Sequence, residues 1–212
     1  MKNQAWSVFR ALATVASLGV CSIANANLTN ATYYSTDYNA LTCLVNFNAA
    51  SSTLSVDGYQ YLPLGVMTGT FYADSADDPK ATKLYTIDND TGSAWSGYDV
   101  NVYMDRAFSI SNAFATLPAN WSVAVTQPVL NPTPVYFGAL EYVGHVKYMA
   151  GTLVPDGGEL DFQYDVGFGG ASSYRFADEL MPEFAVPEPG VLSLAFVGVL
   201  LFCRRSLAKR PC

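Results

Sequence analysis

Acidic side chains at two short segments have the types and spacing that best suit metal chemistry. Asp74, Asp77 and Asp78 lie close together, and Asp88 and Asp90 alternate at the start of a segment rich in oxygen donors. Carboxylate oxygens at such positions are ligands that Ca²⁺ prefers, although the glycine of a complete EF-hand loop is missing. The sequence predicts a weak calcium site at one of these two segments, with a solvated turn as the alternative.

Catalytic constellations are hard to build from this chain. His145 is its one histidine, so a Ser-His-Asp hydrolase would depend on it, and no G-x-S-x-G motif accompanies it. Glycoside hydrolysis needs two opposed carboxyl groups about 5 to 9.5 Å apart. Seventeen acidic residues between positions 27 and 186 make some such pair inevitable without identifying it. We therefore expect no catalysis by the chain, and a secreted glycan-active hydrolase is the alternative.

Tyrosine is abundant and suggests a binding role. All 14 tyrosines lie between positions 33 and 174, and Tyr33, Tyr34 and Tyr38 cluster near the start of that region. Aromatic faces can stack on sugar rings, but amphipathic tyrosines also suit half-buried strands. A polysaccharide-binding or ice-binding module is therefore an alternative to an inert structural protein, although no regular Thr-x-Thr array supports ice.

Composition and charge limit the class of protein. The chain of 212 residues is 50% hydrophobic and 14% aromatic, which is enough to bury a core. Its formal net charge is -7, and residues 27–186 hold only five basic residues against seventeen acidic ones. A nucleic-acid partner is excluded on these grounds.

Strands must position whatever site this region carries. Apolar and polar residues alternate with period two in segments such as 98–105, 121–126 and 160–168, which is typical of half-buried strands. We expect one antiparallel β-sandwich, jelly-roll or Ig-like, with no internal helix. Cys43 is the one cysteine of this region and is predicted to be a buried apolar residue, with a reactive or intermolecular thiol as the alternative. Further strands are expected near 40–47, 53–60, 64–73, 82–88, 107–114, 134–140, 143–149 and 172–178.

The N-terminus is typical of a secretory signal peptide. A basic start is followed by the apolar, small-residue run 11–23 and by an A-x-A site formed by Ala24 and Ala26. The run has about 13 residues, whereas a membrane-spanning helix needs about 20. We expect a short signal helix and cleavage before Asn27. A lipoprotein signal at Cys21 is an alternative, which the bulky residue before it disfavours.

The C-terminus has three unlike parts in a fixed order. Val186-Pro187-Glu188-Pro189 precedes the apolar stretch 190–203, and basic residues beginning with Arg204 and Arg205 follow. A helix over the apolar stretch would be about 21 Å long, shorter than the roughly 30 Å hydrocarbon core. The basic residues would stay cytoplasmic, which places the region from position 27 to position 185 outside.

This tail resembles the PEP-CTERM sorting signal of Gram-negative bacteria, and the resemblance covers residues 186–212 together with the companion signal peptide. It implies that Pro187, Glu188 and Pro189, which follow Val186, are a recognition motif and that Arg204 and Arg205 stop transfer. It also implies an exosortase-type membrane transpeptidase as partner, a transient stay in the inner membrane, and delivery to the cell surface or to extracellular polysaccharide. The expected organisation is a signal peptide over 1–26, an acidic β-sandwich over 27–185 and a sorting tail with a short hydrophobic helix over 186–212.

Overall fold

The computed structural model describes residues 26–75 and 77–186, and all regular elements in these ranges are strands. The signal helix and the C-terminal hydrophobic helix that the sequence predicts lie outside the described residues. Within the described ranges no helix is long and apolar enough to cross a membrane. The strands are β1 (Leu28–Ser35), β2 (Leu41–Asn48), β3 (Thr53–Gln60), β4 (Gly65–Ala73), β5 (Lys80–Asn89), β6 (Trp95–Met104), β7 (Phe108–Leu117), β8 (Ser122–Leu130), β9 (Tyr142–Val154), β10 (Glu159–Phe168) and β11 (Ser173–Phe184).

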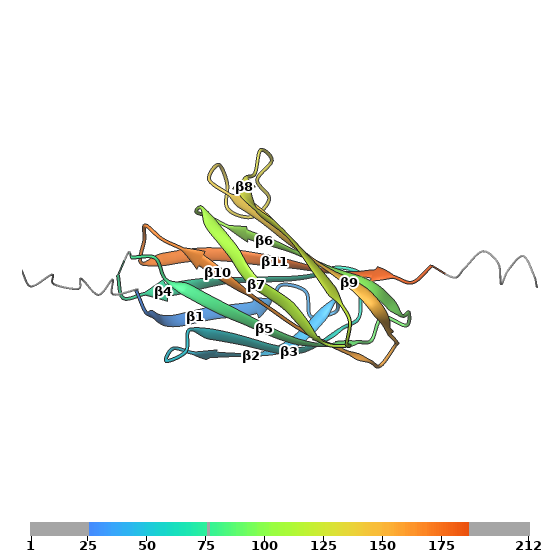
Figure 1. The fold of residues 1–212 in the computed structure, drawn as a ribbon. Helices are drawn as coiled ribbons and strands as arrows, with labels where there is room; N and C mark the ends of the chain where they lie inside the picture. The colour runs from blue at the N-terminus through green and yellow to red at the C-terminus, as the bar shows by residue number, and fades with distance from the viewer. Residues whose placement is uncertain (1–25, 76, 187–212) are drawn as a thin grey trace, which may run out of the picture.

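The strands form two packed sheets, which confirms the all-β sandwich (Figure 1). The six-stranded sheet has the order β1-β4-β11-β6-β9-β8, and the five-stranded sheet has the order β2-β3-β5-β10-β7. A wholly antiparallel arrangement was the expectation, and it is wrong for one pair, because β3 and β5 are parallel. The reason is that the intervening strand β4 belongs to the opposite sheet, so the chain leaves the five-stranded sheet and returns to it in the same direction.

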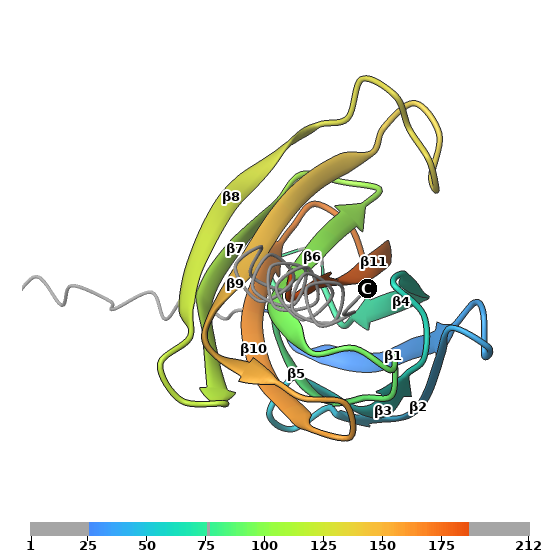
Figure 2. The same ribbon diagram turned by 90° about the vertical axis from the view of Figure 1, so that its right-hand side faces the viewer.

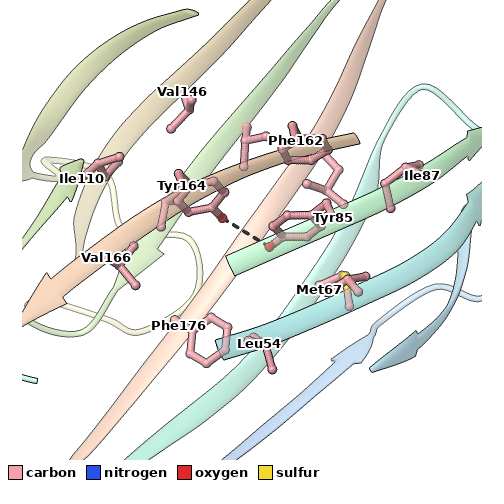
Figure 3. Packing of buried hydrophobic residues seen from close by; sticks show 14 of the residues in the cluster. Leu54, Met67, Tyr85, Ile87, Ile110, Val146, Phe162, Tyr164, Val166 and Phe176 are labelled. Atoms are coloured by element: carbon pink, nitrogen blue, oxygen red, sulfur yellow. Dashed lines mark hydrogen bonds between the residues drawn. The ribbon is translucent and has the colours of Figure 1, made fainter. Parts of the chain in front are cut away.

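The core lies between the two sheets and is rich in aromatic rings (Figure 3). Along β10, Leu160, Phe162 and Tyr164 alternate with polar residues and are at most 3% exposed. Phe162 stacks on Tyr85 of β5 with ring centroids 4.6 Å apart. Each large apolar side chain buried in this way stabilises the fold by about 1.5 to 3 kcal/mol. Trp121 was expected in the core with Phe162 and Tyr164, and it is buried there, with 9% of its surface exposed.

Two segments differ from the sequence expectation. The strand β1 was missed, because a bulge between Leu28 and Asn30 interrupts the alternation that marks a strand. The segment 134–140 was predicted to be a strand but forms part of the connection between β8 and β9. Figures 1 and 2 show this connection, in yellow, projecting from the end of the β8–β9 hairpin. Pro132 and Pro134, just before and at the start of the predicted strand, lack the backbone donors that a central strand would need.

Candidate functional site

The outer face of the six-stranded sheet presents polar side chains in cross-strand rows. In one row Thr32 of β1 lies opposite Thr70 of β4, which in turn lies opposite Arg175 of β11. In the next row Tyr34 lies opposite Thr68. These residues alternate with the core-facing residues of the same strands, so the pleat alone directs them outward.

The β8–β9 connection is held in place by a buried carboxylate. Glu141 is 0% exposed, and its Oε1 accepts hydrogen bonds from Asn131 Nδ2 at 2.7 Å and from the Val135 amide at 2.9 Å. Its Oε2 accepts from the amides of Tyr136 at 2.7 Å and Phe137 at 2.9 Å. Burial raises the pKa of this carboxyl group, but the four donors outweigh it and hold the pKa below its ordinary value. The loop is therefore built around an ionised side chain.

The loop and the sheet together border an open surface groove of about 270 Å³, which we call the outer groove. Arg175 lies in it with its guanidinium 5.2 Å from the ring centre of Phe137, and its Nε donates to Asp105 Oδ2 at 3.0 Å. Tyr34 is 54% exposed, so much of its side chain is open to solvent. Aromatic side chains, hydroxyls and one guanidinium therefore share a single surface. The outer groove is lined by Thr32, Tyr34, Thr68, Gly69, Thr70, Tyr136, Phe137 and Arg175.

A second carboxylate fixes the wall of the outer groove. Glu179 Oε1 accepts the hydroxyl of Tyr136 at 2.8 Å, and its Oε2 accepts from the Tyr103 hydroxyl and from Asn101 Nδ2, both at 2.9 Å. The two tyrosine rings meet edge to face with centroids 5.0 Å apart. Burial and the bond to Glu179 both raise the pKa of Tyr103 and Tyr136, so these hydroxyls remain donors at any physiological pH. Both oxygens of Glu179 are thus already engaged, which leaves this acid poorly suited to catalysis.

His145 belongs to the same face and has a structural partner. Its Nδ1 lies 2.6 Å from Asn101 Oδ1, and Asn101 also contacts Glu179. The register places His145 between Asn101 of β6 and Thr126 of β8. The imidazole thus extends a polar network across three strands.

The first predicted calcium segment has other roles in the structure. Asp74 accepts hydrogen bonds from the backbone amide of Asn27 at 2.9 Å and from its side chain at 3.4 Å. Asp77 pairs with Ser75, whose hydroxyl donates to Asp77 Oδ2 at 3.1 Å. Asp78 lies apart from these contacts, beside Gly169 at the end of β10. In the part of the chain that the structure describes, no three acidic, histidine or cysteine side chains gather as a metal site.

The second predicted calcium segment belongs to an acidic patch on the outer face of the five-stranded sheet. Asp88 lies directly opposite Glu159 across the β5–β10 pair. Burial raises the pKa of Asp88, and the neighbouring charges of Asp90, Asp57 and Asp161 raise it further. For Glu159 the charge of Asp161 is the largest cause of a raised pKa. The patch therefore carries mutual repulsion, and calcium binding there stays a prediction.

The three tyrosines that cluster in the sequence separate in the structure. Tyr33 is 7% exposed and points into the core, whereas Tyr34 lines the outer groove. Tyr38 is 64% exposed in the β1–β2 connection, outside the outer groove. Strand alternation explains the split between the first two, because adjacent residues of β1 face opposite sides.

The sorting and cleavage positions lie at or beyond the ends of the described chain. Val186 is 85% exposed, and the motif residues after it, together with Arg204 and Arg205, lie outside the described residues. At the other end Ala24 also lies outside them, while Ala26 is buried and Asn27 contacts Asp74.

Sequence reasoning missed the loop half of the outer groove. Phe137 and Arg175 were not singled out, and Tyr136 was placed in a strand. The usable signal was Asn131 followed by two prolines and then by Glu141, since a lone acid after a proline-rich turn can bind several backbone amides.

Comparisons with known proteins give no family for this chain. It matches no protein-family profile, no curated protein and no solved structure.

Proposed function

We propose that this chain is an exported, non-catalytic β-sandwich that binds polysaccharide through the outer groove. The observation that carries the proposal is the convergence of Tyr34, Phe137 and Arg175 with three threonine hydroxyls in one open groove. Polysaccharides offer flat sugar faces to aromatic rings and hydroxyl or carboxylate groups to a guanidinium and to hydroxyls.

The shape of the outer groove favours binding over hydrolysis. Its volume of about 270 Å³ is just below the range of small-molecule sites, which begins at about 300 Å³, so it suits part of a long chain. Hydrolysis of a glycosidic bond needs two free carboxyl groups that face each other. The described residues that line this groove include no acid, and neighbouring Glu179 is held by three donors.

The test is binding to extracellular polysaccharide purified from the producing cells, measured by pull-down and calorimetry. We expect Tyr34→Ala to weaken binding about five- to tenfold, because loss of one stacked ring is worth about 1 to 1.4 kcal/mol. The matched control is Tyr59→Ala, since Tyr59 is 47% exposed on β3 of the other sheet. Equal binding by the wild type and Tyr34→Ala, or an equal loss with Tyr59→Ala, would reject the outer groove as the site.

Export through the cleavage site before Asn27 is a second part of the proposal. The backbone nitrogen of Asn27 lies 2.9 Å from Asp74 Oδ1. Cleavage there would turn this nitrogen into a charged α-amino group, and the Asp74 carboxylate would then be its ion-pair partner. The contact supports a mature chain that begins at Asn27. Mass spectrometry of the protein from its native cells should find this N-terminus, and a retained signal segment would contradict it.

Sorting by an exosortase-type transpeptidase is the third part, and it rests on the tail. The motif follows Val186, which is highly exposed just after β11 ends at Phe184. Each proline disfavours helix and central strand, so the sequence of the motif favours an extended backbone. An exposed, extended segment is what a transpeptidase can bind. Replacement of Pro187, Glu188 and Pro189 with alanine should abolish processing and surface display. Unaltered processing would refute this part.

The strand order supports a jelly roll over an Ig-like sandwich as the finer description of the fold. Strands β4-β11-β6-β9 in one sheet and β5-β10-β7 in the other follow the order of two interlocked Greek keys. In this description β1, β2 and β3 are additions at one edge, and β8 has moved to the edge of the six-stranded sheet. A solved structure with a different strand order would overturn it.

A further inference from the structure

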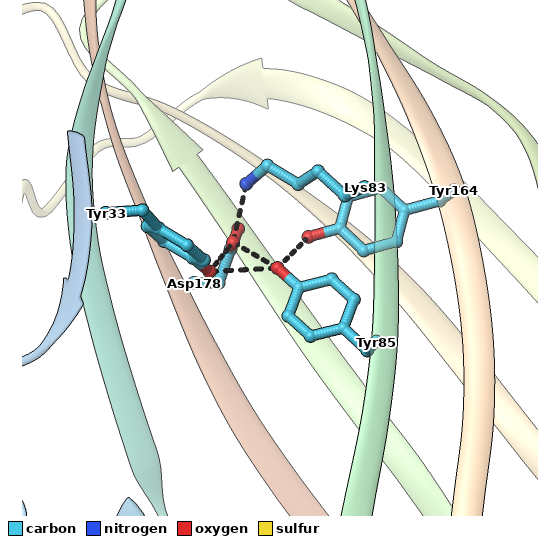
Figure 4. A network of polar contacts seen from close by, with 5 residues as sticks. All are labelled: Tyr33, Lys83, Tyr85, Tyr164 and Asp178. Carbon is cyan, nitrogen blue, oxygen red and sulfur yellow. Dashed lines mark hydrogen bonds and ion pairs between the residues drawn. The ribbon is translucent and has the colours of Figure 1, made fainter. Parts of the chain in front are cut away.

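A lysine and an aspartate meet in the interior, between the two sheets (Figure 4). Lys83 comes from β5 of the five-stranded sheet and Asp178 from β11 of the six-stranded sheet. Their side chains are 1% and 0% exposed, and Lys83 Nζ lies 2.5 Å from Asp178 Oδ2. An amine and a carboxyl group are therefore held in contact where bulk water is excluded.

The amine lies among aromatic rings. Its Nζ is 4.0 Å from the ring centre of Phe176, 5.1 Å from that of Tyr33 and 5.6 Å from that of Tyr164. Burial lowers the pKa of Lys83, while the charge of Asp178 acts in the opposite direction and the net result is a lowered pKa. The neutral amine, which is the nucleophilic form, is thus more accessible here than on a surface.

The carboxyl group has two very unequal oxygens. Besides Lys83 Nζ, Asp178 Oδ2 accepts the hydroxyl of Tyr85 at 2.7 Å and that of Tyr33. In contrast, Oδ1 is buried and has no hydrogen-bond partner among the described residues. Burial first, and then the charge of Asp178, raise the pKa of both tyrosines, so they stay protonated donors. One oxygen is positioned to carry negative charge and the other is free to leave.

A permanent ion pair explains this arrangement incompletely. Removing two charges from water costs several kcal/mol for each ion, and the cost is recovered only if every lone pair is satisfied. The unpartnered Oδ1 of Asp178 does not meet that condition. A neutral amide in the same place would remove both charges and the unpartnered oxygen together.

We propose that Lys83 and Asp178 condense to an intramolecular amide bond that joins β5 to β11. The Lys83 ammonium first passes one proton to the carboxylate, where it comes to Oδ1, and the lone pair of Nζ then adds to Cγ of Asp178. The hydroxyls of Tyr33 and Tyr85 stabilise the negative charge that develops on Oδ2, as in an oxyanion hole. One C–N bond forms and the bond from Cγ to Oδ1 breaks. Two of the three ammonium protons leave with Oδ1 as water, and the third remains on the amide nitrogen. The step is redox-neutral and needs no co-reactant.

The bond would suit an extracellular protein with few other cross-links. It would join residues 95 positions apart and enclose β6 to β10 in one covalent loop. Cys43 is the one free cysteine among the described residues, so the interior of that region gains no disulfide. The amide would take the place of a disulfide and, unlike one, would resist reduction.

The test is mass spectrometry of the protein purified from cells and unfolded before measurement. The intact mass should be lower than that of its sequence by one water molecule. Trypsin should fail to cleave after Lys83, so segment 81–106 should appear as a branched peptide joined to the segment that begins at Phe176. An unmodified peptide that ends at Lys83 and carries no branch, as the main product, would overturn the proposal.

Variants separate the amide from other losses of water. An aspartate that cyclises on its own backbone also loses water, but that reaction does not need Lys83 and would persist in Lys83→Arg. Because the proposed amide requires Lys83, we expect Lys83→Arg to keep its full mass. Tyr85→Phe should slow condensation about 100-fold, the effect of removing one oxyanion donor, and leave uncondensed chains in fresh preparations. The matched control is Tyr148→Phe, because Tyr148 is equally buried but donates to the Gln163 carbonyl oxygen. Loss of water in Lys83→Arg, or equal rates in the two tyrosine variants, would contradict the mechanism.

Discussion

The carboxylate of Glu141 offers the sharpest test of how the outer groove is built. In Glu141→Gln the side chain keeps its size, but an NH₂ group replaces one oxygen. If it replaces Oε2, it faces the amides of Tyr136 and Phe137, which now donate at 2.7 and 2.9 Å. Two hydrogen bonds to a charged group are then lost, each worth about 1.5 to 3 kcal/mol. The loop should therefore be destabilised by about 3 to 6 kcal/mol, as an upper limit, because water will solvate part of the freed backbone.

Native-state hydrogen exchange measures this effect residue by residue. A loss of 3 kcal/mol corresponds to faster exchange by about 100-fold, since each 1.4 kcal/mol is tenfold. We expect exchange of the amides of Val135, Tyr136 and Phe137 to become faster by about this factor, while core amides of β10 stay protected. Glu183→Gln is the control, because Glu183 pairs with Lys147 at a side-chain exposure of 42% and such pairs contribute about 0 to 1 kcal/mol. Unchanged protection of the three loop amides in Glu141→Gln would refute the role of Glu141.

Three further predictions concern charge and reactivity. Although burial acts in the opposite direction, hydrogen bonds lower the folded-state pKa values of Glu141 and Asp165. The stability that these two carboxylates contribute is therefore present above the unfolded-state pKa of about 4 and is lost as pH falls through the folded-state pKa. Urea unfolding should show a lower midpoint at pH 3 than at pH 7, and equal midpoints would contradict this prediction. Glu159→Lys should raise the melting temperature by about 1 to 3 °C at low salt, because it turns a repulsive cross-strand contact with Asp88 into an attractive one, and a lower melting temperature would count against the acidic patch. Cys43 is half-buried, and its pKa is raised mainly by burial. It should therefore react with iodoacetamide much more slowly in the native protein than in urea, and equal rates would show that the thiol is exposed in the native protein.

The sequence predicted the strands where alternation was regular. In β10 the apolar positions from Leu160 to Phe168 are buried as the period of two requires. Cys43 was expected to be buried and is only half-buried, because β2 is an edge strand of its sheet. The parallel pairing of β3 with β5 could not be predicted, since pairing partners depend on which sheet the intervening strand joins.

The candidate site was predicted only in part. Tyr34 was one of three clustered tyrosines considered for sugar binding, but its partners in the outer groove, Phe137 and Arg175, come from positions more than a hundred residues away. The contact of Lys83 with Asp178 was likewise invisible, because it joins residues 95 positions apart and from different sheets. Neither residue stands out in the sequence, where each is one charge within an otherwise ordinary strand.

Local order along the chain determined the period-two strands, the acidic charge and the expected processing signals at the two ends, because each of these depends on neighbouring residues alone. Tertiary structure decided the pairing of strands, the assembly of the outer groove and the burial of an amine against a carboxyl group. Those features arise when two sheets close on each other, since packing brings together side chains that have no relation in sequence and removes the water between them.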